Sequence, residues 1–194
     1  MSDPTSCPDQ DLVAAALRDR NAYAQIVGRW QPVLSRYLRR LLGQSLEATD
    51  DVLQEVFIKV YVNLNDYDPT RPFGPWIYRI TRNEALSFLR KRKAEPPMVT
   101  GEDAQLIIER LSDGVDVQET AERMRIEEKV RGAINQLDLR YRDVLVLRFL
   151  EDKGYDEIAE IMQVPPGTIA TLISRGTKQL RSALEAIGLK VGSS

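Results

Sequence analysis

Few side chains in this sequence could catalyse a reaction. There is no His and only one Cys, Cys7, among 194 residues. Histidine bases, Cys-His pairs and ordinary zinc sites are therefore excluded. The carboxylates fall in polar stripes of expected helices, and neither a glycine-rich phosphate loop nor a cluster of metal ligands occurs. We expect no enzyme activity, no cofactor and no metal, and a helical enzyme has little support.

The charged side chains suit binding instead, and they are segregated along the chain. The formal net charge is −2, yet residues 71–93 hold seven basic groups and one acidic group. Residues 94–121 hold one basic and seven acidic groups, and residues 166–194 hold four basic and one acidic. Two basic stretches on either side of an acidic one predict two domains joined by a linker. The basic stretches are compatible with a nucleic-acid partner, which the net charge alone would argue against.

Aromatic side chains and arginines are interleaved in residues 65–83, in a loop with prolines and the helix expected after it. An aromatic face beside an arginine suits an unstacked base, because stacking contributes roughly 1–3 kcal/mol per base and the guanidinium binds phosphate. The amide of Asn83 offers a donor and an acceptor to a base edge. The alternative is a buried aromatic core with solvated arginines. We expect that alternative to hold for Trp76 and Ile80.

Near the other end of the chain, two helices are expected around a tight turn, at 155–162 and 166–187. Gly154 is the N-cap expected for the first helix, and Pro166 suits the first turn of the second. The second helix would turn its polar and basic side chains outward, as a helix that enters a major groove does. Those side chains are Thr171, Ser174, Arg175, Lys178 and Arg181. The alternative is a pair of helices that only pack together and leave a solvated basic face.

A further polar stripe is expected on the helix at 48–64. Asp51, Gln54, Glu55 and Lys59 project together at helical spacing. The opposite stripe is apolar and suits the core; it comprises Leu53, Phe57, Val60, Tyr61 and Leu64. On the residues alone, a solvated surface explains the polar stripe better than a binding face does.

The elements that must position these side chains all have helical period. Apolar stripes run from Leu12 to Val27 and from Val33 to Leu42, with Pro32 as a break or a first-turn residue. Other helices are expected at 75–93, 121–137 and 139–151, and no strand pattern is found. The fold class is all-α, with two small helical domains at 1–93 and 122–194, joined by a flexible acidic linker at 94–121. The second domain contains the helix-turn-helix.

Membrane insertion is not expected. The longest apolar run, Leu12 to Leu17, is six residues, whereas a spanning helix needs roughly 20. No signal peptide precedes that run, and one Cys cannot form an internal disulfide. We expect a soluble protein of the cytoplasm.

Three regions of the chain resemble one family. Tyr155-x-x-Ile158-Ala159, Gly167-Thr168-Ile169 and Ser174-Arg175-Gly176 with Leu180 are similar to the carboxy-terminal DNA-binding domain of bacterial sigma factors of the extracytoplasmic-function group. Asp51-x-x-Gln54-Glu55-x-Phe57 resembles the helix with which these factors bind the clamp helices of the largest RNA polymerase subunit. Trp76-x-x-x-Ile80-x-x-Asn83 resembles the segment that captures the melted −10 element.

The resemblance implies a dissociable specificity subunit of RNA polymerase and assigns residues to three surfaces. The residues implied for binding core polymerase are Asp51, Gln54, Glu55 and Phe57. Those implied for −10 DNA are Tyr67, Arg71, Phe73, Arg79, Arg82 and Asn83. Those implied for −35 DNA are Thr168, Thr171, Ser174, Arg175 and Lys178. The acidic linker would thread the polymerase product channel, although it equally resembles a solvated tether.

Partners are implied in the same way: RNA polymerase core, promoter DNA and an anti-sigma factor, which could be membrane-anchored. One departure from the family affects the −35 surface, because Ala170, Thr171 and Leu172 stand where basic residues often begin the recognition helix. Arg175 and Lys178 are left as the best candidates for direct base readout. Leu172 could contact a thymine methyl, pack on the preceding helix or bind a protein. An alternative function is a decoy that binds an anti-sigma factor without binding DNA, but such a decoy would not need Asn83 or the basic loop.

Overall fold

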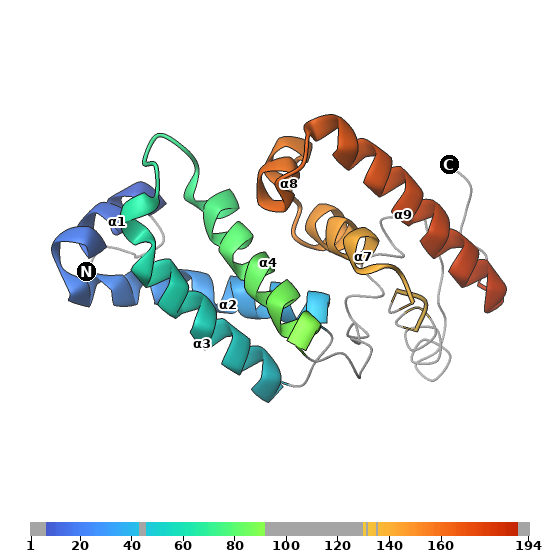
Figure 1. Ribbon diagram of the computed structural model, residues 1–194, viewed down its shortest axis with the longest axis horizontal. Coiled ribbons are helices and arrows are strands. Elements are labelled where there is room, and N and C mark those ends of the chain that lie inside the picture. The colour runs from blue at the N-terminus through green and yellow to red at the C-terminus, as the bar shows by residue number, and fades with distance from the viewer. Residues whose placement is uncertain (1–6, 43–45, 92–129, 131, 135, 190–194) are drawn as a thin grey trace.

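The computed structural model describes residues 7–42, 46–91, 130, 132–134 and 136–189, and its regular elements in these ranges are helical (Figure 1). The first half comprises α1 (Asp9–Arg18), the 3-10 turn η1 (Arg20–Ala22), α2 (Tyr23–Leu42), α3 (Leu46–Val62), the 3-10 turn η2 (Leu64–Asp66) and α4 (Phe73–Lys91). The second comprises α7 (Leu139–Leu145), the π-helical turn η3 (Val146–Leu150), α8 (Tyr155–Met162) and α9 (Pro166–Ala186). The predicted all-α class is confirmed.

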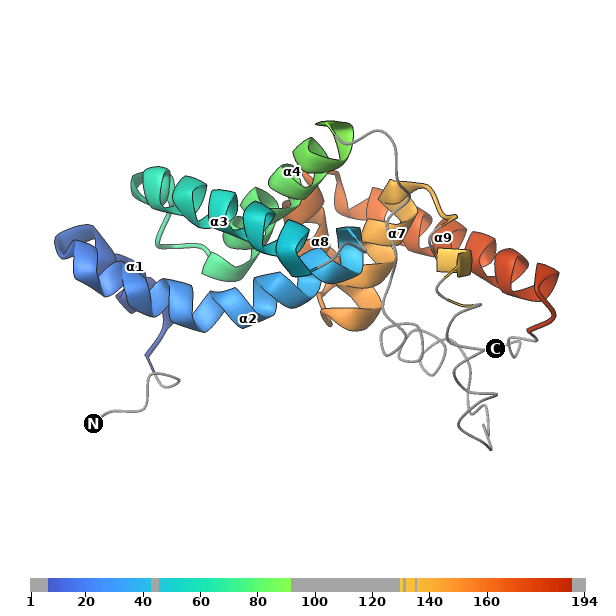
Figure 2. The same ribbon diagram turned by 90° about the horizontal axis from the view of Figure 1, so that it is seen from below.

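The helices form two groups that pack against each other. In the first group, α2 contacts α1, α3 and α4; in the second, α9 contacts α7 and α8. The groups meet where α4 lies beside α8, in the middle of the molecule (Figures 1 and 2). The predicted linker at 94–121 and both of its boundaries lie outside the described residues, so the domain limits stay predictions.

Pro32 neither breaks a helix nor lies in a first turn, the two alternatives that the sequence predicted, because it lies inside the continuous helix α2. A proline inside a helix removes one backbone hydrogen bond and costs about 3 kcal/mol. Its side chain is exposed, whereas Ile26 before it and Leu34 after it are buried in the same core. Burial of the apolar stripe on both sides offsets the local cost. The break instead falls at Asp19, whose carboxylate accepts a hydrogen bond from the Asn21 amide at 3.0 Å.

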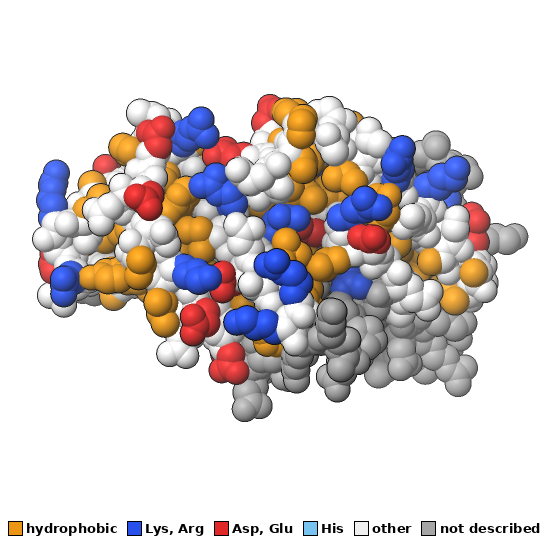
Figure 3. Space-filling model, in the orientation of Figure 1, with side chains coloured by type: hydrophobic (Ala, Val, Ile, Leu, Met, Phe, Trp, Pro, Cys, Tyr) orange, Lys and Arg blue, Asp and Glu red, His pale blue; other side chains and the backbone are white. Residues whose placement is uncertain are grey.

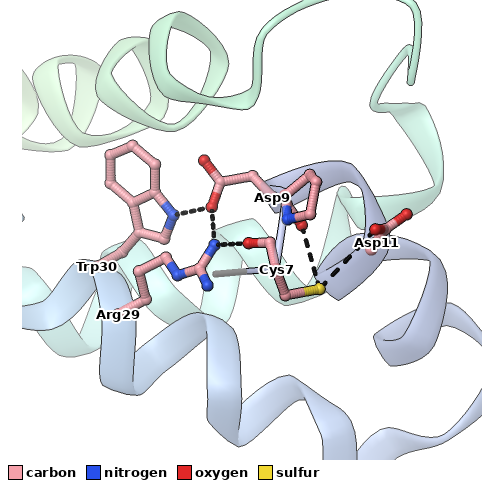
Figure 4. Close-up of polar contacts among 6 residues, drawn as sticks. Cys7, Asp9, Asp11, Arg29 and Trp30 are labelled. Carbon is pink, nitrogen blue, oxygen red and sulfur yellow. Dashed lines mark hydrogen bonds and ion pairs between the residues drawn. The ribbon is translucent and has the colours of Figure 1, made fainter. Parts of the chain in front are cut away.

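A polar cluster fixes α1 on α2 (Figure 4). The Arg29 guanidinium donates to the Cys7 carbonyl at 2.7 Å and to the Asp9 carboxylate at 2.9 Å. The same carboxylate accepts from the Trp30 indole at 3.3 Å. The Trp30 ring is thereby held edge-on to Phe73, with ring centroids 5.8 Å apart. Through Trp30, the start of α1 is connected to the start of α4.

In the second half, polar side chains complete short helices. Asp138 caps α7 by accepting from the Arg140 amide. The buried Arg142 guanidinium donates to the carbonyls of Ile134 and Leu137, and burial lowers the pKa of Arg142 to about 10. It therefore stays charged at neutral pH.

The predicted helix-turn-helix is confirmed by α8, α9 and the turn between them. The Glu157 carboxylate accepts from the Gly154 amide at 2.9 Å at the start of α8, as its position predicted. Gln163 ends α8 in the left-handed conformation, with φ of 56°. The buried face of α9 consists of Ile169, Ile173, Gly176, Leu180 and Leu184. Within the described residues, none of the helices combines the length and the apolar character that crossing a bilayer requires.

Replacing Pro32 with Ala tests whether the proline is a local cost inside α2. Pro32→Ala restores a backbone donor and should raise the free energy of unfolding by about 1–3 kcal/mol, after allowance for the greater freedom of the unfolded chain. Thermal and denaturant unfolding measure the change. Gln31→Ala, at the exposed neighbouring position, should change stability by less than about 0.5 kcal/mol. A clear loss of stability in Pro32→Ala would show that the helix does not continue through residue 32.

Candidate protein and nucleic-acid interfaces

A groove of about 510 Å³ lies between α2 and α3. Its lining is mainly apolar and aromatic and comprises Tyr23, Val27, Gln31, Asp50, Leu53, Gln54, Phe57, Ile58 and Tyr61. The Tyr23 hydroxyl donates to the Phe57 carbonyl at 2.7 Å, and the Tyr23 and Tyr61 rings meet edge to face at 5.0 Å. These contacts hold the aromatic wall of the groove in place.

The predicted polymerase-binding residues lie on or beside this groove. Gln54 and Phe57 line it, and Asp51 and Glu55 are exposed on the same helix. Lys59, the last member of the predicted polar stripe, pairs instead with Glu84 of α4 at 2.5 Å.

Sequence reasoning missed part of the groove because it assigned Tyr61 to the core alone, whereas it placed Phe57 both in the apolar stripe and among the residues implied for polymerase. The buried face of α3 actually contains Val52, Leu53, Val56 and Val60, whereas Phe57 is half-buried and Tyr61 is 39% exposed. Ile58 is 50% exposed. The sequence did hold a signal for this groove. Its apolar residues continue around α3 beyond one stripe, which indicates a second apolar contact besides the core.

Two adjacent hollows lie beside the start of α4. One, of about 220 Å³, is lined by Asp66, Tyr67, Asp68, Arg71, Trp76, Arg79 and Glu160. The other, of about 380 Å³, is lined by Lys59, Asn63, Asp66, Trp76, Arg79, Ile80, Asn83 and Glu84. Four of the residues predicted for −10 DNA are thus brought together: Tyr67, Arg71, Arg79 and Asn83.

The aromatic rings in this region form the floor and support of the hollows. Tyr67, Phe73 and Trp76 are only 6%, 2% and 8% exposed, and their rings pack with centroids 5.1–5.6 Å apart. The Tyr67 hydroxyl also donates to the Arg71 carbonyl, which fixes the loop. The expectation that Trp76 is core is confirmed, and Ile80 is partly buried. The sequence predicted that Tyr67 and Phe73 offer exposed ring faces on which a base could stack. In this structure both rings are buried instead, because they pack with Trp30 and Trp76.

The loop before α4 is shaped by Asp68. Its carboxylate accepts from the Thr70 amide at 2.9 Å and from the Thr70 hydroxyl at 2.7 Å, and these two bonds lower the pKa of Asp68. The Arg71 amide then donates to the Asp68 carbonyl. The turn places the exposed Arg71 side chain at the rim of the smaller hollow.

Arg82, also predicted to bind −10 DNA, does not line either hollow. Its guanidinium donates to Asp143 of α7 at 2.5 Å, and its side chain is 15% exposed. The two groups are far apart in the sequence, so residue spacing carried no signal of this pair.

All five residues predicted for −35 DNA are exposed on α9: Thr168, Thr171, Ser174, Arg175 and Lys178. Arg175 and Lys178 also line a shallow hollow beside Tyr141. Leu172, left open by the sequence, is partly buried and packs against the core. Figure 3 shows Lys and Arg side chains scattered over the face that carries α4 and α9.

Comparison with known proteins identifies two regions of the chain. The model described as sigma-70 region 2 matches residues 26–95, and the model described as sigma-70 region 4 matches residues 127–180. The chain is 32% identical over 170 residues to the ECF RNA polymerase sigma factor SigW of Bacillus subtilis, which covers 86% of this chain and 90% of the relative. It is 34% identical over 184 residues to the RNA polymerase sigma-H factor of Pseudomonas aeruginosa, which covers 92% and 95%.

Two solved structures share the fold. The structure of CnrH in complex with the cytosolic domain of CnrY matches with a TM-score of 0.66 and 24% identity, over 92% of this chain and 97% of that one. The sigma factor RpoE in complex with the anti-sigma factor NepR from Bartonella quintana matches with a TM-score of 0.59 and 21% identity, over 84% and 96%.

The burial of Phe73 generates a prediction about stability. Phe73→Ala leaves a cavity between Trp30 and Trp76 and should lower the free energy of unfolding by about 3–5 kcal/mol. Pro72→Ala, at the exposed neighbouring position, is the control and should change stability by no more than about 1 kcal/mol, through the greater freedom of the unfolded chain. Denaturant unfolding followed by circular dichroism measures both. Wild-type stability in Phe73→Ala would mean that the ring is solvent-exposed rather than part of the core.

Proposed function

Since this chain belongs to the extracytoplasmic-function group of the sigma-70 family, we propose which of its surfaces bind polymerase and promoter. As a sigma factor it directs RNA polymerase to start transcription at promoters, and its relatives are initiation factors rather than catalysts. Sigma factors of this family bind RNA polymerase and promoter DNA, so the question for this chain is which residues make each contact. The proposed role places the chain in the cytoplasm with polymerase.

We infer that core polymerase binds at the groove between α2 and α3, and this groove is the observation that carries the proposal. A partner helix fits such a surface, since an apolar groove with an exposed rim takes the apolar face of an amphipathic helix. Phe57, Ile58 and Tyr61 would supply the apolar contact. Asp51 and Glu55 would steer the clamp helices of the largest subunit through complementary charge.

We propose that the hollows beside α4 hold the melted −10 strand. Arg71 and Arg79 are placed to meet its phosphates, and the exposed Asn83 amide is placed to meet a base edge. Tyr67, Phe73 and Trp76 would shape the site from below instead of stacking as free rings. Strand opening would then draw on pocket contacts that offset the few kcal/mol needed to extrude a base. Arg82 would join the phosphate contacts once it leaves Asp143.

We propose that α9 reads the −35 duplex from the major groove. Thr168, Thr171 and Ser174 face solvent near the start of the helix, and Arg175 and Lys178 follow on the same exposed side. Arg175 is the best candidate for a base, because its guanidinium can donate two hydrogen bonds to guanine. Leu172 packs inward, so it is a weaker candidate for a thymine methyl.

An anti-sigma factor is proposed as the regulating partner. The two solved relatives of the same fold are described with a bound partner, in one case an anti-sigma factor and in the other a cytosolic domain. The groove between α2 and α3 would serve such a partner as well as it serves polymerase, because both need an apolar surface. Competition for this groove would keep the sigma factor from polymerase.

Charge reversal beside the groove tests the polymerase surface. Asp51→Lys and Glu55→Lys should each weaken core binding by at least about tenfold, since a like charge at an interface costs several kcal/mol. Glu185→Lys, an exposed reversal on α9, is the control and should bind as the wild type does. Co-elution and a fluorescence binding assay with purified core polymerase measure the effect. Wild-type affinity in both α3 variants would refute the assignment.

In vitro transcription separates the initiation factor from a decoy. With purified core polymerase and the region upstream of candidate target genes, the chain should give a promoter-specific transcript that Asn83→Ala and Arg79→Ala reduce. A decoy would bind an anti-sigma protein and give no such transcript on any template.

Substitution on α9 tests the −35 surface. Arg175→Ala should weaken binding to a cognate −35 duplex by about 1–3 kcal/mol and relax preference at one base pair. Lys178→Ala should weaken all duplexes alike and lower the slope of log affinity against log salt by about 1. Titrations at several salt concentrations give both quantities, with Glu185→Ala as the control. If neither variant alters duplex binding, α9 does not carry the −35 contacts.

A further inference from the structure

Two buried carboxylates of the second half receive hydrogen bonds from the first half. Asp143 of α7 is completely buried and accepts from the Tyr37 hydroxyl at 2.9 Å and from Arg82 at 2.5 Å. Tyr37 lies on α2 and Arg82 on α4. The partners that the structure gives this carboxylate therefore come from the opposite helical group.

Glu151, just after η3, is placed in the same way. Its side chain is 1% exposed and accepts from Arg40 of α2 at 2.7 Å and from the Tyr78 hydroxyl of α4 at 2.6 Å. Arg36 lies 3.7 Å away on the solvent side, with 47% of its side chain exposed. Arg40 also donates to the Leu150 carbonyl at 2.8 Å. Two separate carboxylates thus fix the second half on α2 and α4.

A third acidic group of the second half reaches the proposed −10 site. Glu160 of α8 lines the smaller hollow together with Arg71 and Arg79, and it lies 3.7 Å from Arg71. Asp143 meanwhile neutralises Arg82. Carboxylates therefore stand where phosphates of the promoter would have to lie.

The docked arrangement is also too short for a promoter. The −35 and −10 elements lie about 25 base pairs apart, which is about 85 Å of duplex. Two domains of about 60–80 residues, side by side, reach only about 60 Å. Because α4 and α8 are packed together, the two proposed DNA surfaces cannot reach both elements in this arrangement.

We propose that the free sigma factor is self-inhibited, with Asp143 and Glu151 holding the second half closed on α2 and α4. The proposal rests on the proposed function only for its consequence; the closure itself is a property of the chain alone. Polymerase has to present both DNA surfaces to one promoter, so it would bind the open form, and the intrinsic affinity would be multiplied by the fraction of molecules that are open. Breaking the contacts from either side should open the chain and strengthen polymerase binding.

The test uses the full-length chain and two pairs of substitutions. Asp143→Asn with Glu151→Gln removes the charges from the second half and keeps the side-chain shapes. Tyr37→Phe with Tyr78→Phe removes only two hydroxyl donors from the first half and keeps the ring packing with each other and with Trp30. Asp156→Asn with Glu185→Gln, at two exposed carboxylates, is the matched control. Circular dichroism identifies any variant that fails to fold. If one test pair does not fold, the other test pair decides whether the proposal holds.

Small-angle X-ray scattering of the monomer gives the first readout. The wild type and the control pair should be compact, and both test pairs should increase the radius of gyration by at least about one tenth. An extended wild type, or folded test pairs as compact as the control, overturns the proposal.

Affinity for core polymerase gives the second readout, and it separates a failure of self-inhibition from a failure of the proposed function. Each test pair should bind at least about threefold more tightly than the wild type, while the control pair should be unchanged. Opened variants with unchanged affinity would overturn self-inhibition. If no variant binds polymerase at all, the proposed function fails, and scattering alone then decides whether the chain closes on itself.

Discussion

The docking of the second half of the molecule on the first depends on the burial of Asp143 and Glu151 in a surface formed by α2 and α4. A buried carboxylate is costly unless hydrogen bonds and an opposite charge compensate for lost water, and each of these two has an arginine and a tyrosine hydroxyl. Burial raises the pKa of Asp143 and Arg82 opposes that rise. Burial together with the charge of Asp143 raises the pKa of Tyr37, so its hydroxyl stays a donor. The network thus keeps one defined set of donors and acceptors.

These polar contacts can only form because an aromatic cluster holds α2 and α4 at a fixed separation. The Tyr78 ring packs edge-on against Tyr37 at 5.1 Å and against Trp30 at 6.2 Å, and Trp30 is held in turn by Asp9. Both phenol hydroxyls therefore point from a rigid base toward the second half. The same cluster includes Phe73 and Trp76, which support the hollows beside α4. One packed core consequently positions the proposed −10 site and the surface that covers it.

The sequence predicted the parts of this structure that are local in the chain. The helical period located α3, α4, α8 and α9 to within about two residues, and glycine and proline placement predicted the turn before α9. Pro32 was misread, because a local rule was overridden by burial on both sides of it. Tyr61 was misplaced for a related reason: the helical period predicts which residues share a face, but the packing of the neighbouring helix decides which edge of that face is covered. Arg82 was assigned to DNA without its partner, because a pair 61 residues apart leaves no mark in spacing.

The chemistry of the contact between the halves also bears on how readily they separate. Buried ion pairs give a docked surface a defined geometry, but their Coulombic gain is largely offset by the loss of hydration, so their net contribution is small. An apolar interface of equal size would hold the halves together more strongly and with less selectivity. A closed state built on Asp143 and Glu151 can therefore be specific and still lie only a few kcal/mol below the open one. A partner needs only that much differential affinity to shift the population, and promoter DNA gains it from the arginines that Asp143 and Glu160 release.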